Sequence, residues 1–202
     1  MLLYTADPQG IIANRLGEYR DRELGSNGLG LAFGGAAAFG VGDSVIWYAH
    51  TSAFDIHAVD PQGVPVRIVR LDRSPPAVTE AEVAEAKASV EESLRRQGVS
   101  GPAVARILTT EYATRHALMA RILLDDSGQL WISRYMNTLV AEPSVATQRD
   151  TWDVFDADGG LRGHVVLPVG FRLTQISGDR ILGVHSDDLG VQRVRVYRFS
   201  RH

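Results

Sequence analysis

Five residues are candidates for binding a ligand, because their side chains are aromatic or can carry a positive charge and they lie at or near the ends of expected strands: Tyr112, Arg115, His116, Arg134 and Tyr135. Aromatic and arginine side chains carry much of the binding energy in protein interfaces, and histidine exchanges a proton near neutral pH. His116 follows the polar residues Glu111, Tyr112 and Arg115 and precedes an expected β-strand, so we expect polar groups to gather at the start of that strand. The sequence therefore predicts a ligand-binding group at these positions, with a solvated loop histidine as the alternative for His116. It identifies no catalytic residue.

Acidic residues raise a second hypothesis, a site for a divalent ion such as calcium or zinc. The turns at 125–128 (DDSG) and 156–159 (DADG) supply hard oxygen ligands, but neither continues to the glutamate that closes an EF-hand loop. In a metal-dependent hydrolase or lyase, the four residues Asn137, Glu142, Asp187 and Asp188 could gather at the mouth of the central channel and bind the ion. The six histidines form no HExxH motif or close pair, and no Gly-x-Ser-x-Gly elbow occurs. We therefore expect no metal and no cofactor, and keep the metal enzyme as the alternative.

The glycine-rich segment at 25–35 (GSNGLGLAFGG) superficially resembles a nucleotide-binding loop. Its Gly28-x-Gly30 spacing does not extend to a dinucleotide fingerprint, and no β-α-β unit surrounds it. We expect it to be a connection between sheets.

Composition excludes several classes of partner. The chain has 202 residues, 21 basic and 24 acidic, with a net charge of −3 and no basic stripe, so neither nucleic acid nor a membrane surface is an expected partner. It has no cysteine, which excludes disulfides and leaves the compartment undetermined. We find neither a leader-like N-terminus nor an apolar run of the roughly 18 residues that a membrane span needs.

A turn of the form Asp-x-x-Gly recurs between β-rich segments and organises the chain. It occurs at 7–10, 60–63 and 156–159, and such turns join antiparallel strands. Strands are expected at 2–6, 11–16, 36–41, 44–49, 54–59, 64–71, 117–124, 130–135, 151–155, 161–167, 172–176, 180–185 and 191–199. They group into units of two, four, four and three strands, which predicts an all-β chain of antiparallel four-stranded meanders, the blades of a β-propeller. An ordinary β-sandwich is the alternative.

One helix is expected within the longest connection, at about 79–97. Thr79 to Glu82 form a capping box, an apolar stripe runs from Val83 to Leu94, and Gly98 ends the helix. Alternation of the strands places all long connections, at 17–35, 72–116 and 137–150, at one end of the sheets, where loops on a rigid scaffold usually carry function. The helix is interpreted either as a lid over that end or as a cover for the end of one blade.

Several segments resemble a known family. They are 152–156 (WDVFD), 167–168 (LP), 170–173 (GFRL), 194–199 (VRVYRF), 121–125 (RILLD) and 130–132 (LWI), with Gly128 between the last two. They are similar to the C-terminal half of bacterial six-bladed β-propeller proteins of largely unknown function. The resemblance covers nearly the whole chain and implies a fold, but it implies no catalytic residues.

The number of units implies a partial propeller of about three blades. We expect one domain over 1–202: the end of one blade at 1–16, a blade at 36–71, a helical crossing at 72–116, a blade at 117–167 and a terminal blade at 171–199. Either the chain is the C-terminal half of a longer protein, or a second copy completes the ring as a homodimer. The expected function is a non-catalytic binding or scaffold module that engages a protein, peptide or carbohydrate through the end with the long loops.

Overall fold

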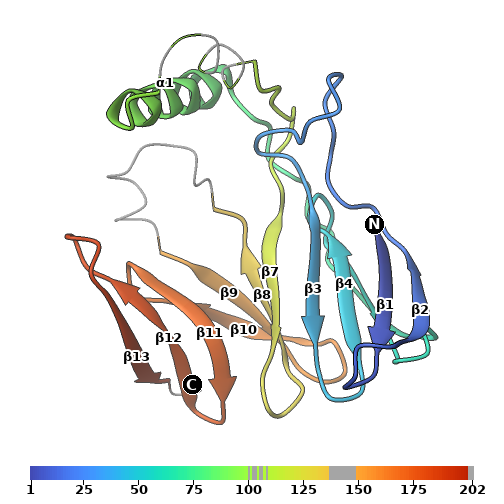
Figure 1. Ribbon diagram of the computed structural model, residues 1–202. Coiled ribbons are helices and arrows are strands. Elements are labelled where there is room, and N and C mark those ends of the chain that lie inside the picture. Colours follow the sequence, from blue (N-terminus) through green and yellow to red (C-terminus); the bar gives the residue numbers. More distant parts are fainter. Residues whose placement is uncertain (100, 102–103, 105–106, 108, 137–148, 200–202) are drawn as a thin grey trace.

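The structure, a computed structural model, describes residues 1–99, 101, 104, 107, 109–136 and 149–199. Its described part is all-β, with four antiparallel sheets and one helix, α1 (Glu80–Arg96), at one end of the molecule (Figure 1). The helix is 17 residues long, and no helix in the described residues is long and apolar enough to span a bilayer. Two residues of the metal hypothesis, Asn137 and Glu142, lie outside the described residues.

The sheets contain two, four, four and three strands in chain order, which confirms the predicted grouping. The strands are β1 (Leu2–Ala6) and β2 (Ile12–Glu18); β3 (Ala37–Val41), β4 (Ile46–His50), β5 (Asp55–Val59) and β6 (Pro65–Arg70); β7 (Met119–Leu124), β8 (Leu130–Arg134), β9 (Thr151–Phe155) and β10 (Leu161–Val166); and β11 (Phe171–Ser177), β12 (Arg180–Ser186) and β13 (Gln192–Arg198). Each strand is hydrogen-bonded to its neighbour in sequence, so every sheet is a meander. Most boundaries differ from the expected ones by one or two residues.

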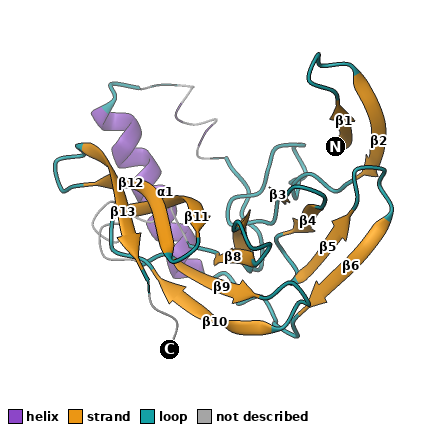
Figure 2. Cartoon of the chain, turned by 90° about the horizontal axis from the view of Figure 1, so that it is seen from below, coloured by secondary structure: helices purple, strands orange, loops and turns teal. Residues whose placement is uncertain are grey.

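Consecutive sheets follow one another along an arc, which is open within the described residues (Figure 2). Strands β3 and β7, each at an edge of its sheet, lie side by side. Gly40 in β3 allows this approach, because a Cβ atom there would lie 2.5 Å from the Cγ2 of Ile122 in β7. The glycine therefore sets how closely the two four-stranded sheets pack.

Two apolar cores lie between the sheets. The first joins the β3–β6 and β7–β10 sheets and includes Trp47, Ile56, Ile132 and Phe155. The second joins the β7–β10 and β11–β13 sheets and includes the members Trp131, Trp152, Leu173 and Ile181. Alternation along the strands explains the division, since Trp131 and Ile132 are neighbours in β8 and face opposite cores. The β7–β10 sheet thus contributes to both cores, chiefly through β8 and β9, while β10 is largely exposed.

The Asp-x-x-Gly turns share one hydrogen-bond pattern. In each, an aspartate Oδ1 accepts from the backbone N–H groups two and four residues later; the residues are Asp7, Asp60, Asp125, Asp156 and Asp187. The glycine three residues after each aspartate has a φ between +76° and +85°, a conformation that favours glycine. These aspartates therefore serve the turns, as their β-turn chemistry predicts.

The connections differ in length between the two ends of the sheets. The turns after β1, β3, β5, β7, β9 and β11 lie at one end and are short, whereas residues 19–36 and the described residues between 71 and 118, including α1, lie at the other end (Figure 1). We call this second end the long-loop face. The predicted helix is confirmed with its capping box: the Thr79 hydroxyl accepts from the Glu82 N–H, and the Glu82 carboxylate accepts from the Thr79 N–H.

Candidate functional site

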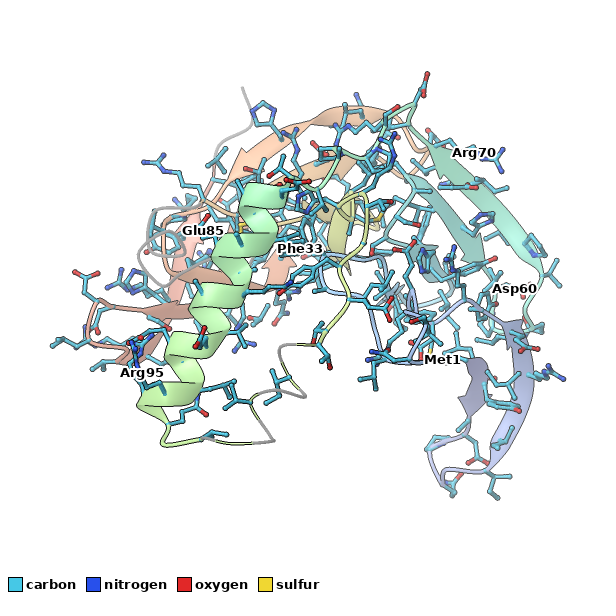
Figure 3. All side chains as sticks on the ribbon, turned by 90° about the horizontal axis from the view of Figure 1, so that it is seen from above. Met1, Phe33, Asp60, Arg70, Glu85 and Arg95 are labelled. Carbon is cyan, nitrogen blue, oxygen red and sulfur yellow. The ribbon has the colours of Figure 1, made fainter. Side chains whose placement is uncertain are left out.

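Aromatic rings from three separate segments meet at the long-loop face. The Phe33 ring lies 5.2 Å from that of Tyr112 and 5.1 Å from that of His116, and the His116 ring lies 5.7 Å from that of Tyr135. We call these four residues the aromatic group. Phe33 and His116 are buried, while Tyr112 and Tyr135 are half-buried, so the group has a covered centre and an accessible margin. Phe33 lies beside α1 when the molecule is viewed from the helix side (Figure 3).

Short backbone pairings hold these segments together. Tyr112 forms a parallel bridge with Ala32, Arg115 forms an antiparallel bridge with Ala77, and the His116 N–H donates to the Pro76 carbonyl at 2.9 Å. The long connection is therefore fastened at both its beginning and its end, which places the aromatic side chains.

Phe33 has an unusual backbone conformation. Its φ is +63°, and no other non-glycine residue in the described part of the chain has a positive φ. A bulky residue in this region costs on the order of 1–3 kcal/mol and persists only where the surroundings impose it. Here the Phe33 carbonyl accepts from the Ala117 N–H at 3.1 Å, and the buried ring packs on His116. The strain therefore lies at the centre of the aromatic group.

The helix contacts this group through polar side chains. The Glu82 Oε1 lies 3.0 Å from the His116 Nε2, and the Lys87 ammonium lies 5.7 Å from the centre of the Tyr112 ring. The capping-box hydrogen bonds of Thr79, followed by the contact with His116, hold the pKa of Glu82 below its ordinary value. Burial, with a smaller effect of the Glu82 charge, raises the pKa of Tyr135.

His116 has one unsatisfied ring nitrogen. Its side chain is 8% exposed, and its Nδ1 is buried without a hydrogen-bond partner in the described part of the chain. If Nε2 carries the proton that is donated to Glu82, Nδ1 is left as an acceptor. A buried acceptor of this kind costs about 1–3 kcal/mol until a donor reaches it.

A second cluster lies next to the aromatic group in sequence. Arg134, which precedes Tyr135, donates from Nη2 to the Asp153 Oδ1 at 2.7 Å, and Arg73 donates from Nη1 to the Asp153 Oδ2 at 2.7 Å. We call Arg73 and Arg134 the arginine pair. Burial opposes the charge on Asp153, but the hydrogen bonds from Arg134 and Arg73 outweigh it, so the pKa of Asp153 lies below its ordinary value. The bond to Asp153 raises the pKa of Arg134.

The structure brings together three of the five predicted site residues, Tyr112, His116 and Tyr135. Arg134 is adjacent in sequence but turns toward Asp153, and Arg115 is exposed and donates from Nη1 to the Pro75 carbonyl at 2.8 Å. His116 is buried, which excludes the solvated loop histidine considered above.

Sequence reasoning missed four members of these clusters: Phe33, Arg73, Glu82 and Asp153. Glu82 was recognised as a capping residue, but nothing in the sequence paired it with His116. Asp153 gave the clearest available signal, since a charged residue inside an otherwise apolar strand must find a partner.

No group of three or more acidic, histidine or cysteine residues in the described ranges is arranged to hold a metal ion. Asp187, one residue of the metal hypothesis, closes a turn, and its Oδ2 lies 3.7 Å from Arg193. Asp126 accepts from the Ser177 hydroxyl and the Gly178 N–H of the next sheet. These carboxylates are therefore committed to the fold.

Comparison with known proteins gives no assignment: no protein-family model matches the chain, and no curated protein is significantly similar to it.

Proposed function

We propose that this chain is a non-catalytic binding module, a partial β-propeller that engages a protein, peptide or carbohydrate through its long-loop face. The observation that carries the proposal is that two clusters, the aromatic group and the arginine pair, both lie at the strand ends of that face: Arg73 follows β6 and Arg134 ends β8. Both are built from segments far apart in sequence, and aromatic and arginine side chains are the types that anchor interfaces.

The propeller interpretation is supported by repetition. Two consecutive four-stranded meanders, a shared turn and an open arc of sheets fit radial blades better than a sandwich, which has no reason to repeat the turn. In that interpretation the sheets are a scaffold and the connections at one end carry the binding residues.

Local strain also supports a binding role. The ring of Phe33, a residue with positive φ, contacts the ring of His116, whose Nδ1 has no hydrogen-bond partner among the described residues. The strained backbone and the unsatisfied nitrogen each cost free energy in the folded state. Costs of this kind cluster at sites that are selected for something other than stability.

The test is a binding selection that assumes no ligand. The wild-type chain is screened against peptides displayed on phage and against a glycan array, and the retained ligands are measured again with Arg115→Ala and Tyr112→Ala. Arg162→Ala is the matched control, because Arg162 is exposed, lies on β10 just after a short turn and pairs with Asp156 at 2.8 Å.

We expect binding that falls at least about tenfold with either long-loop variant and is unchanged in the control. A selection that returns no ligand, or ligands that respond to Arg162→Ala instead, would contradict the proposal.

A further inference from the structure

The arginine pair carries more positive charge than its partner neutralises. Asp153 is 1% exposed and supplies one negative charge, whereas Arg73 and Arg134 supply two positive charges. Among the described residues, Asp153 is the acidic partner that both arginines share, and neither contacts a second carboxylate. Counted over the described contacts, the two arginines and Asp153 therefore carry one positive charge in excess.

The guanidinium groups also retain donors. Each guanidinium has five N–H donors. Within the described chain, Arg73 reaches Asp153 through Nη1, and Arg134 reaches it through Nε and Nη2. The side chains are 32% and 44% exposed, while the carboxylate between them is buried. The exposed part of the cluster therefore belongs to the arginines and not to the carboxylate.

Both guanidiniums are held in place before any ligand arrives. The bond from Arg134 to Asp153 is of the bidentate kind, and the Arg73 guanidinium also lies over the Phe54 ring, 5.2 Å from its centre. A rigid donor pair loses less side-chain entropy on binding than two free arginines would. The buried aspartate therefore holds both arginine side chains in position, with part of each exposed to solvent.

We infer that the arginine pair binds a carboxylate group of the ligand. Guanidinium forks match the geometry of carboxylate and phosphate oxygens. The excess of a single positive charge favours a carboxylate, because a phosphate dianion would leave a net negative charge beside the buried Asp153. The inference rests on the proposed function for its setting at the long-loop face, but the pair can be tested without any macromolecular ligand.

The test follows the Nε–Hε signals of arginine by nuclear magnetic resonance during titration with sodium acetate. Sodium chloride at matched ionic strength and inorganic phosphate are the comparison salts. Signals are assigned from Arg73→Lys and Arg134→Lys, which keep the charge and protect the fold but lose the fork. Arg70 is the internal control, since it pairs with Asp55 at 2.9 Å and no second arginine of the described residues shares that carboxylate; the His57 Nε2 lies 3.2 Å from the same oxygen.

We expect the Arg73 and Arg134 signals to shift saturably with acetate, more weakly with phosphate and negligibly with chloride, while Arg70 responds to none of them specifically. In either lysine variant the saturable shift of the remaining arginine should be lost. Shifts of equal size at Arg70, or equal shifts with chloride, would overturn the inference, and tighter binding of phosphate would overturn the choice of carboxylate.

Peptide probes then separate the source of the carboxylate and keep the two proposals distinguishable. Peptides retained in the selection described above are compared with glutamine in place of glutamate, and with an amidated in place of a free C-terminus. If acetate binds but neither peptides nor glycans do, the anion site stands and the proposed binding function fails. If peptides bind without any effect of these changes, the function stands and the carboxylate inference fails.

Discussion

Two aspartates only three residues apart meet opposite environments on the two faces of the β7–β10 sheet. Asp153 accepts hydrogen bonds from Arg73 and Arg134, and its pKa lies below the ordinary value. Asp150 accepts a hydrogen bond from the Trp152 Nε1 at 2.8 Å, and burial raises its pKa, with only partial compensation from that bond and from Arg121. The difference teaches that direct arginine hydrogen bonds, rather than a nearby positive charge, make a buried carboxylate favourable here.

Arg121 explains why the second face lacks such bonds. Its Nη2 donates to the Leu173 carbonyl at 2.7 Å, and its guanidinium lies 5.3 Å from the centre of the Trp152 ring. Burial lowers the pKa of Arg121. The arginine at this face therefore joins two sheets, whereas the arginines at the other face hold a carboxylate.

The largest expected effect comes from Asp153→Asn. The variant replaces the charge-assisted hydrogen bonds from both arginines by weaker ones and turns an amide N–H2 toward an arginine, so we expect the free energy of unfolding to fall by about 2–3 kcal/mol. The loss stays below that of a fully buried ion pair because both arginines reach solvent. Urea denaturation measures it, with Asp55→Asn at the exposed pair with Arg70 as the control, expected below about 1 kcal/mol. Equal losses for Asp153→Asn and Asp55→Asn would show that the arginine pair stabilises Asp153 no more than an exposed ion pair would.

The same residue predicts a pH dependence. Because the folded-state pKa of Asp153 is lower than its unfolded value near 3.8, its stabilisation is present above that value and is lost as the pH falls through the folded pKa. The difference in stability between wild type and Asp153→Asn should therefore be constant from pH 7 to 5 and shrink below about pH 4. Urea midpoints at pH 7, 5, 4 and 3 test this, and a gap that stays constant throughout would argue against the ionised pair.

At the face that carries Asp150, we expect Arg121→Gln to lower the free energy of unfolding by about 1–2 kcal/mol, because the variant loses the hydrogen bond to the Leu173 carbonyl and the contact with Trp152. The matched control is Arg172→Gln, at an exposed position of the adjoining strand β11, where we expect less than about 0.5 kcal/mol. Thermal unfolding of the two variants distinguishes them. A larger loss at 172 would mean that Arg121 does not join the sheets.

The smallest effect, with the opposite sign, is expected for Asp150→Asn. A raised folded-state pKa means that ionisation destabilises the fold, so wild-type stability attributable to Asp150 increases as the pH falls through that pKa. Asparagine keeps an acceptor for Trp152 and removes the charge; at pH 7 we expect no loss and a gain of up to about 1 kcal/mol. A loss as large as that of Asp153→Asn would show that the two faces treat charge alike.

The sequence was sufficient for the sheets and insufficient for the site, for a physical reason. Strand alternation and Asp-x-x-Gly turns are local signals, and they predicted every described strand and the helix from Thr79 onward. The contact of Phe33 with His116, and of Arg73 with Asp153, joins residues about 80 apart in the chain. No spacing rule connects such residues, because their meeting depends on how one sheet packs against the next.

The pairing of Ala32 with Tyr112 has a consequence for folding. Each meander is made of neighbouring strands, so it closes through short-range contacts, which form quickly. The bridge between Ala32 and Tyr112 instead closes a loop of about 80 residues, and loop-closure entropy delays such contacts. We therefore expect the contacts that close the long-loop face to form later than the hairpins within each sheet. Because Tyr135 and Asp153 belong to the two clusters, a chain emerging from the ribosome can complete this face only after residue 153 has been made.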